Sequence, residues 1–168
     1  KTIEVAKKQA ENDLDDDVDL TSIVGNIIIK TETDTSLGII ENLNEQSKES
    51  ESNLSLKILT KVSKDEKFEE KFKEISDKSN VADQIVEELI EKAIDDIKSD
   101  KDIDTVVEII DKGGDFLNEK IIEINKKTDN EKKLKIDKII DKIIKEDPIK
   151  VKKIIEKEKE KEKKIIKE

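Results

Sequence analysis

The sequence predicts an all-α protein whose short antiparallel helices stack as an irregular α-solenoid or as a helical bundle. Leu, Ile, Val and Phe make up 51 of the 168 residues, about 30%, whereas disordered chains fall below roughly 20%. These residues recur at helical spacing from Ser52 onward, separated by residues that start or stop helices. Charged residues are 46% of the chain and largely cancel in sign, so we expect a thin core consisting mainly of isoleucine.

The first predicted segment, residues 1–52, is acidic and combines short helices or a hairpin with loops. Apolar residues within it fit one helical face: Leu20, Ile23, Val24, Ile27 and Ile28. The same stretch also fits a β-hairpin with strands at 21–24 and 27–33 around the two-residue turn Gly25-Asn26. Isolated hairpins are marginal in water, so we prefer the helix and keep the hairpin as the alternative. For residues 31–53 the sequence predicts a short helix between loops.

The second predicted segment, residues 53–147, is a body of helical hairpins. Ser63 and Glu66 have the spacing of a capping box, which predicts a helix carrying Phe68, Phe72 and Ile75 on one face. We expect Asn80 to cap the next helix. That helix has the widest apolar stripe in the chain: Val81, Ile85, Val86, Leu89, Ile90, Ala93, Ile94 and Ile97. A shorter helix is expected from about Asp102 to Gly113-Gly114, because glycine accepts the left-handed conformation that ends helices.

Two further helices complete the body, and a third forms the last segment, residues 148–168. We expect Asp115 to cap one helix, and Thr128 with Glu131 to form a capping box for the next. The second of these carries an inward stripe: Leu134, Ile136, Ile139, Ile140, Ile143 and Ile144. Pro148 suits the first position of a C-terminal helix rich in Lys and Glu. The short links between helices predict antiparallel neighbours.

Two internal periods appear in the sequence. Predicted helix starts near 81, 116 and 148 recur about every 33 residues, which is typical of stacked helical hairpins. A shorter period repeats Lys-Ile-Ile at 142–144, 153–155 and 164–166, with Pro148 interrupting it. The residues on which we base the core are Ile85, Leu89, Ile110, Ile121, Ile140, Ile143 and Ile154.

Six residue types are missing from the chain: Arg, His, Cys, Met, Trp and Tyr. Nucleophilic, metal-binding and redox chemistry depends largely on these types, and serine or threonine has no histidine base here. The three aromatic residues, all Phe, are few for a deep apolar pocket. We therefore expect a protein without enzymatic activity, without catalytic residues and without a cofactor.

One acidic cluster is a candidate metal site. Asp13, Asp15, Asp17 and Asp19 stand at alternate positions, and hard carboxylate oxygens suit Ca²⁺. The pattern does not fit an EF-hand loop, because Val18 occupies the glycine position when the loop is counted from Asp13. Two interpretations stay open, a solvated acidic loop and a weak calcium site of another kind.

The distribution of charge indicates what the chain binds. Residues 1–118 hold 16 lysines and 31 acidic residues, a net charge of −15, whereas residues 119–168 carry +5. Such end-to-end polarity favours head-to-tail association, so the expected partners are other copies of the chain or another protein. We expect no nucleic-acid binding, since arginine is absent and aromatics are few. A membrane surface is not an expected partner either, because Glu alternates with Lys in the basic part.

These observations predict a structural or interaction protein, a helical spacer, scaffold or subunit of a larger assembly. The alternative is an acidic binding module that recognises a cationic partner or Ca²⁺ through residues 13–19. The sequence contains no run of 18 apolar residues, so it predicts no transmembrane helix. The absence of methionine and the start at Lys1 favour a processed piece, and we expect a secreted or cell-surface protein.

Overall fold

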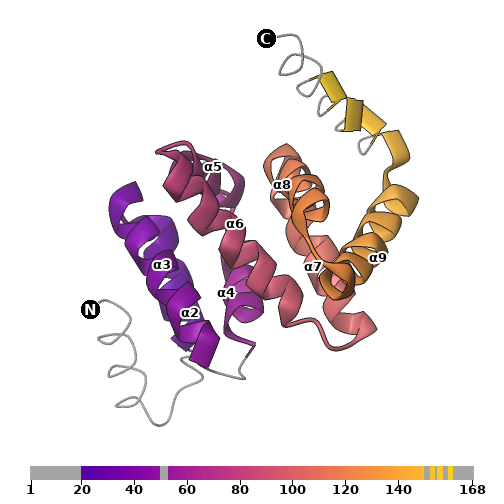
Figure 1. Cartoon of the computed structure of the whole chain (residues 1–168). Coiled ribbons are helices and arrows are strands. Elements are labelled where there is room, and N and C mark those ends of the chain that lie inside the picture. The colour runs from indigo at the N-terminus through magenta and orange to yellow at the C-terminus, as the bar shows by residue number, and fades with distance from the viewer. Residues whose placement is uncertain (1–19, 50–52, 150–151, 154, 157–158, 161–168) are drawn as a thin grey trace. The chain divides into compact units, whose positions relative to one another are not determined.

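The computed structural model of the chain describes residues 20–49, 53–149, 152–153, 155–156 and 159–160, and this part is all-α (Figure 1). Its helices are α2 (Leu20–Lys30), α3 (Thr33–Glu49), α4 (Leu54–Val62), α5 (Phe68–Ser76), α6 (Asn80–Asp95), α7 (Asp100–Lys112), α8 (Gly114–Lys127) and α9 (Asn130–Glu146). No strand occurs among the described residues. The predicted all-α class is confirmed. The chain divides into two compact units, Lys1–Lys98 and Ser99–Glu168.

The stretch that could be a helix or a hairpin is the helix α2. Its buried residues Val24 and Ile28 are four positions apart, which is the spacing of one helical face. Gly25 does not form a turn. It lies where α2 passes close to α4, and a Cβ atom at this position would come within 3.2 Å of a methyl group of Val62. The glycine therefore permits helix packing, and the hairpin alternative is wrong.

The first unit is a bundle of α2 to α6 in which helices distant in sequence pack together. The most extensive contacts join α2 to α4 and α3 to α6, while α4 and α5 also pack on α6. Each helix contributes fully covered side chains to the core, among them Ile28, Ile40, Leu43, Ile58, Phe68, Phe72, Ile75, Leu89 and Ile94. The predicted face of α5 is confirmed, and its two phenylalanine rings meet edge to face at 5.0 Å between centroids.

Polar groups inside the first unit fix the path of the chain between α2 and α3. The Thr31 hydroxyl donates to the carbonyl of Ile27, and the Ser36 hydroxyl donates to the carbonyl of Ile28. Farther along α3, the amide of Asn44 donates to the carbonyl of Ile85 on α6 at 3.0 Å. A buried polar group costs free energy unless it is hydrogen-bonded, so these bonds favour one arrangement of the helices.

A carboxylate that directly follows α6 caps the start of α4. The local N-cap residue, Asn53, makes no side-chain capping bond. Instead the backbone N–H of Leu56, in the first turn of α4, donates to Asp96 at 3.2 Å, across 40 residues of sequence. Burial raises the pKa of Asp96 above its ordinary value of 3.8, and the hydrogen bond from Leu56 acts in the opposite direction.

Both predicted capping boxes are wrong, because their serine and threonine serve the preceding helix. The Ser63 hydroxyl donates to the carbonyl of Thr60, and the next helix begins only at Phe68. The Thr128 hydroxyl donates to the carbonyl of Asn125 in α8. A hydroxyl at the end of one helix has carbonyls within reach, and these compete with the amides of the helix that follows.

Other predicted caps are shifted by one or two residues. Ser79, not Asn80, is the N-cap of α6 and accepts the N–H of Ala82. Likewise α8 begins at Gly114, so Asp115 lies inside its first turn rather than at the cap. Gly114 has a φ of 59°, the left-handed conformation predicted for this glycine pair.

The second unit consists of α7, α8, α9 and the residues that follow Pro148. α7 packs against both α8 and α9, whereas α8 and α9 contact each other less extensively. The buried residues lie on α7 (Ile103, Val106, Val107, Ile109 and Ile110), on α8 (Leu117, Ile121 and Ile124) and on α9 (Ile136 and Ile139). An ion pair between Lys142 and Asp104 also joins α9 to α7.

The predicted core is confirmed in part. Leu89, Ile110 and Ile121 are buried, and Ile85, Ile140 and Ile143 are partly exposed. Ile154 lies outside the described residues. Three residues assigned to inward stripes are exposed instead: Val81 at 65%, Leu134 at 65% and Ile144 at 39%. The predicted segment boundaries at residues 52 and 147 stay a prediction. No helix in the described ranges is long and apolar enough to span a membrane.

Candidate interaction groove

The second unit contains a mostly apolar groove with a volume of about 410 Å³. One wall comes from α8 and one from α9, and Ile155 forms a third boundary. The lining side chains are Asn118, Ile121, Ile122 and Asn125 of α8, Asp137, Ile140, Asp141 and Ile143 of α9, and Ile155. We call this site the groove.

The groove lies between α8 and α9 because each of these helices packs more extensively on α7 than on the other. Both helices pack on α7, and in Figure 1 they diverge from the short connection between them. The ion pair of Lys142 with Asp104 holds α9 toward α7. Apolar side chains on the facing sides of α8 and α9 are therefore only partly covered by one another.

The α8 wall is a regular helical stripe. Asn118, Ile121, Ile122 and Asn125 are spaced by three, four and seven residues, so all four project from one side of the helix. Ile121 is 2% exposed and forms the floor, while Ile122 is partly exposed. An isoleucine pair thus lies between two asparagines along this wall.

The α9 wall combines an apolar base with an acidic edge. Ile140 and Ile143 are partly exposed, although the neighbouring Ile136 and Ile139 are fully covered. Asp137 and Asp141, one helical turn apart, are exposed at the edge. An aliphatic group entering the groove would meet isoleucine at the base and carboxylates at the rim.

The polar lining on α8 is buried more deeply than the carboxylates. The amide of Asn118 donates to the carbonyl of Gly114 at 2.7 Å, so this side chain is used inside its own helix. The Oδ1 atom of Asn125 is buried and has no hydrogen-bond partner within the described part of the chain. A buried amide oxygen of this kind is an acceptor that an N–H group would satisfy.

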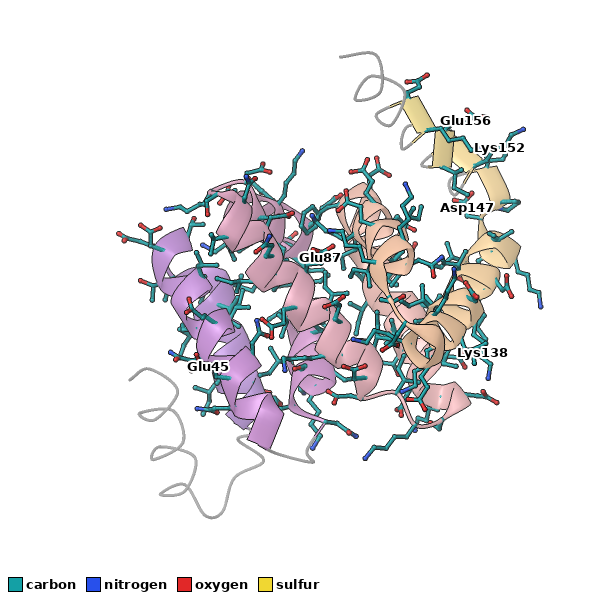
Figure 2. All side chains as sticks on the ribbon, in the orientation of Figure 1. Glu45, Glu87, Lys138, Asp147, Lys152 and Glu156 are labelled. Atoms are coloured by element: carbon teal, nitrogen blue, oxygen red, sulfur yellow. The ribbon has the colours of Figure 1, made fainter. Side chains whose placement is uncertain are left out.

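The third boundary of the groove is a single described residue that follows Pro148 in the sequence. Ile155 lines the groove and is 36% exposed. Lys152 and Glu156, labelled in Figure 2, lie on the same segment and are exposed. One boundary of the groove is thus the apolar side chain of Ile155, which has charged residues as neighbours in the sequence.

The chemistry of the groove follows from the side chains that line it. Its side chains offer aliphatic surface, two carboxylates and two amides, which can bury an apolar side chain and pair with a cation beside it. The sequence prediction placed Ile121, Ile140 and Ile143 in the core and missed the groove. No local signal in the sequence marks the groove, because a helical stripe of isoleucines is equally typical of a covered core face.

The predicted calcium ligands Asp13, Asp15, Asp17 and Asp19 lie outside the described residues, so this site stays a prediction. Within the described ranges, no group of three or more Asp, Glu, His or Cys side chains is placed to hold a metal ion.

Comparison of the chain with protein-family models, with curated proteins and with solved structures finds no match.

Proposed function

We propose that the protein is a non-enzymatic helical scaffold, a subunit that assembles with other copies of itself or with another protein. The observation that carries this proposal is the groove. It leaves Ile122, Ile140 and Ile143, which lie together on the facing sides of α8 and α9, partly exposed.

Apolar surface that stays partly open on a folded unit indicates a binding site for another helix or chain. Helix-in-groove recognition uses an apolar face with anchors at helical spacing, and the groove offers two such stripes as walls. The acidic rim would give a preference for partners with basic side chains.

The composition is consistent with the same role. The chain has no His, Cys or Arg, and its lysines and carboxylates serve chiefly to solvate helices. A scaffold needs defined shape, solubility and a contact surface, and this set of residues can supply all three.

Light scattering of the full chain over a range of concentrations, at low and at high salt, tests the proposal. We expect reversible oligomers whose mass rises with concentration and falls as salt is added, because the rim carboxylates contribute electrostatic attraction. A strict monomer at high concentration in both salts would contradict self-assembly.

A further inference from the structure

Two copies of the Lys-Ile-Ile repeat already contribute to the groove. The repeat stands at 142–144, 153–155 and 164–166. Ile143 from the first copy and Ile155 from the second both line the groove. Isoleucine side chains of this repeat are therefore part of the apolar lining. The third copy, outside the described residues, has the same chemistry.

The charges of the groove complement those of the third copy. The charged side chains that line the groove are the carboxylates Asp137 and Asp141. Residues 163–167 read Lys-Lys-Ile-Ile-Lys, and we call them the tail motif. Two isoleucines flanked by lysines match an isoleucine lining that has carboxylates along one edge.

The tail motif of a chain is joined closely to the groove of the same chain. Ile155 lines that groove, and residues 156–162, which connect Ile155 to the tail motif, are all Glu or Lys. The tail motif of another molecule approaches the groove without this tether, and the cross-linking test below distinguishes the two sources.

We propose that the groove of one copy binds the tail motif of a second copy. Ile165 and Ile166 enter between α8 and α9, and the flanking lysines pair with Asp137 and Asp141. This inference rests on the proposed function, since it names the partner of the same groove.

The first test is sedimentation equilibrium of the full chain and of the variant Ile165→Asn/Ile166→Asn. We expect the dissociation constant of the oligomer to rise at least about tenfold, because the variant loses the apolar surface that enters the groove. The matched control is Ile149→Asn. Ile149 is 68% exposed and precedes the tail motif in the same C-terminal segment, but it does not line the groove, so association should be unchanged.

The second test exchanges the charges. Asp137→Lys/Asp141→Lys in one chain should weaken association, and so should Lys163→Glu/Lys164→Glu/Lys167→Glu in another. We expect a chain that carries both sets of substitutions to recover most of the association. Circular dichroism should show unchanged helix content, because the substituted aspartates are exposed. Failure of the combined variant to recover would count against direct pairing.

The third test uses the absence of cysteine, which makes engineered thiols unambiguous. Asn125→Cys places a thiol in the groove, and Glu168→Cys places one beside the tail motif. A short bis-maleimide should link these two variants into a covalent dimer when they are mixed. A control pair with Glu108→Cys, exposed on α7, in place of Asn125→Cys should give little product.

The outcomes separate this inference from the proposed function. Oligomers that persist unchanged in Ile165→Asn/Ile166→Asn would overturn the inference and leave the scaffold proposal standing. A chain that carries both Asn125→Cys and Glu168→Cys can also be treated with the bis-maleimide. Linkage of its two thiols within a monomer would show that its own tail occupies the groove, which also overturns the inference. A wild-type chain that is monomeric throughout would contradict this inference and the self-assembly part of the proposed function.

Discussion

Helices α6 and α9 have similar apolar stripes in the sequence but different surroundings in the structure. α6 packs against α3, α4 and α5 and buries Val86, Leu89 and Ile94, although Val81 and Ile85 of the same stripe are exposed or partly exposed. α9 packs chiefly against α7 and α8, and it leaves Ile140 and Ile143 partly exposed. The periodic stripe predicts that a helix has an inward face. How much of that face is covered depends on the helices that pack against it.

This difference separates the roles of the two units. The first unit has polar bonds across its helices and a well-covered core, which specify one arrangement. The second has fewer helices and a groove. We therefore expect substitutions in the first unit to change stability, and substitutions in the groove to change association.

The largest expected effect is the loss of a core aromatic side chain from the first unit. Phe72 is 1% exposed and contacts Phe68. Phe72→Ala should lower the free energy of unfolding by about 3–5 kcal/mol, through lost burial and the cavity left behind. Chemical denaturation followed by circular dichroism measures this, with the exposed Val81→Ala as control. Similar costs for both variants would contradict the assigned core.

The next prediction compares two isoleucines of one helix. Ile139 is fully covered and Ile143 lines the groove. Ile139→Ala should cost about 2–4 kcal/mol in stability, and Ile143→Ala less than about 1.5 kcal/mol, since its side chain is only partly covered. The two thermal melts, recorded at a concentration where the chain is monomeric, test this difference. Equal destabilisation would mean that α9 is covered uniformly and that no groove is open.

A smaller effect is expected at the long-range cap. Asp96→Ala removes the acceptor for the Leu56 N–H and should cost about 1–2 kcal/mol. Asp96→Asn keeps an acceptor oxygen and removes the buried charge, so it should cost much less. Denaturant midpoints of both variants at neutral pH give the comparison. An Asn variant as unstable as the Ala variant would indicate that the charge itself stabilises α4.

The raised pKa of Asp96 also sets the sign of its pH dependence. Between the ordinary value of 3.8 and the raised folded pKa, the folded chain binds more protons at this site than the unfolded chain. The contribution of Asp96 to stability therefore falls as pH rises through this window. Unfolding free energies from about pH 3 to 7 should lose this component in Asp96→Asn. A contribution that instead grew with pH would contradict the assigned shift.

The smallest effects concern two glycines in neighbouring helices. No atom lies within 4 Å of a Cβ placed at Gly38, so Gly38→Ala should stabilise the chain by about 0.5–1 kcal/mol through higher helix propensity. At Gly25 the same change meets Val62 at 3.2 Å, so the gain should be smaller or reversed. Thermal melts of both variants test whether α2 and α4 approach as closely as described. Equal stabilisation would contradict that approach.

Much of the fold could be predicted because helices depend on local patterns. The stripe on α6 and the faces of α5 and α7 follow from residues three or four apart, and the glycine pair at 113–114 ends α7 where expected. Cap positions could not be predicted as well, because the hydroxyls of Ser63 and Thr128 can bond either to the carbonyls of the preceding helix or to the amides of the next one. Their hydroxyls bond to the helix that precedes them.

Features that depend on distant residues could not be predicted in this way. The Asp96 cap joins positions 40 residues apart. The need for glycine at position 25 depends on Val62, which belongs to another helix. The groove depends on how far α8 and α9 diverge from α7. No local pattern distinguishes the covered Ile139 from the partly exposed Ile140 and Ile143.

Sedimentation velocity of the wild-type chain, Ile140→Lys and Val81→Lys tests the central claim most directly. Ile140 lines the groove, whereas Val81 is an exposed apolar residue of the first unit. We predict that the wild type and Val81→Lys associate equally and that Ile140→Lys, with unchanged helix content, sediments as a monomer. Association that Ile140→Lys leaves intact would contradict the claim that the groove is the surface through which this protein assembles.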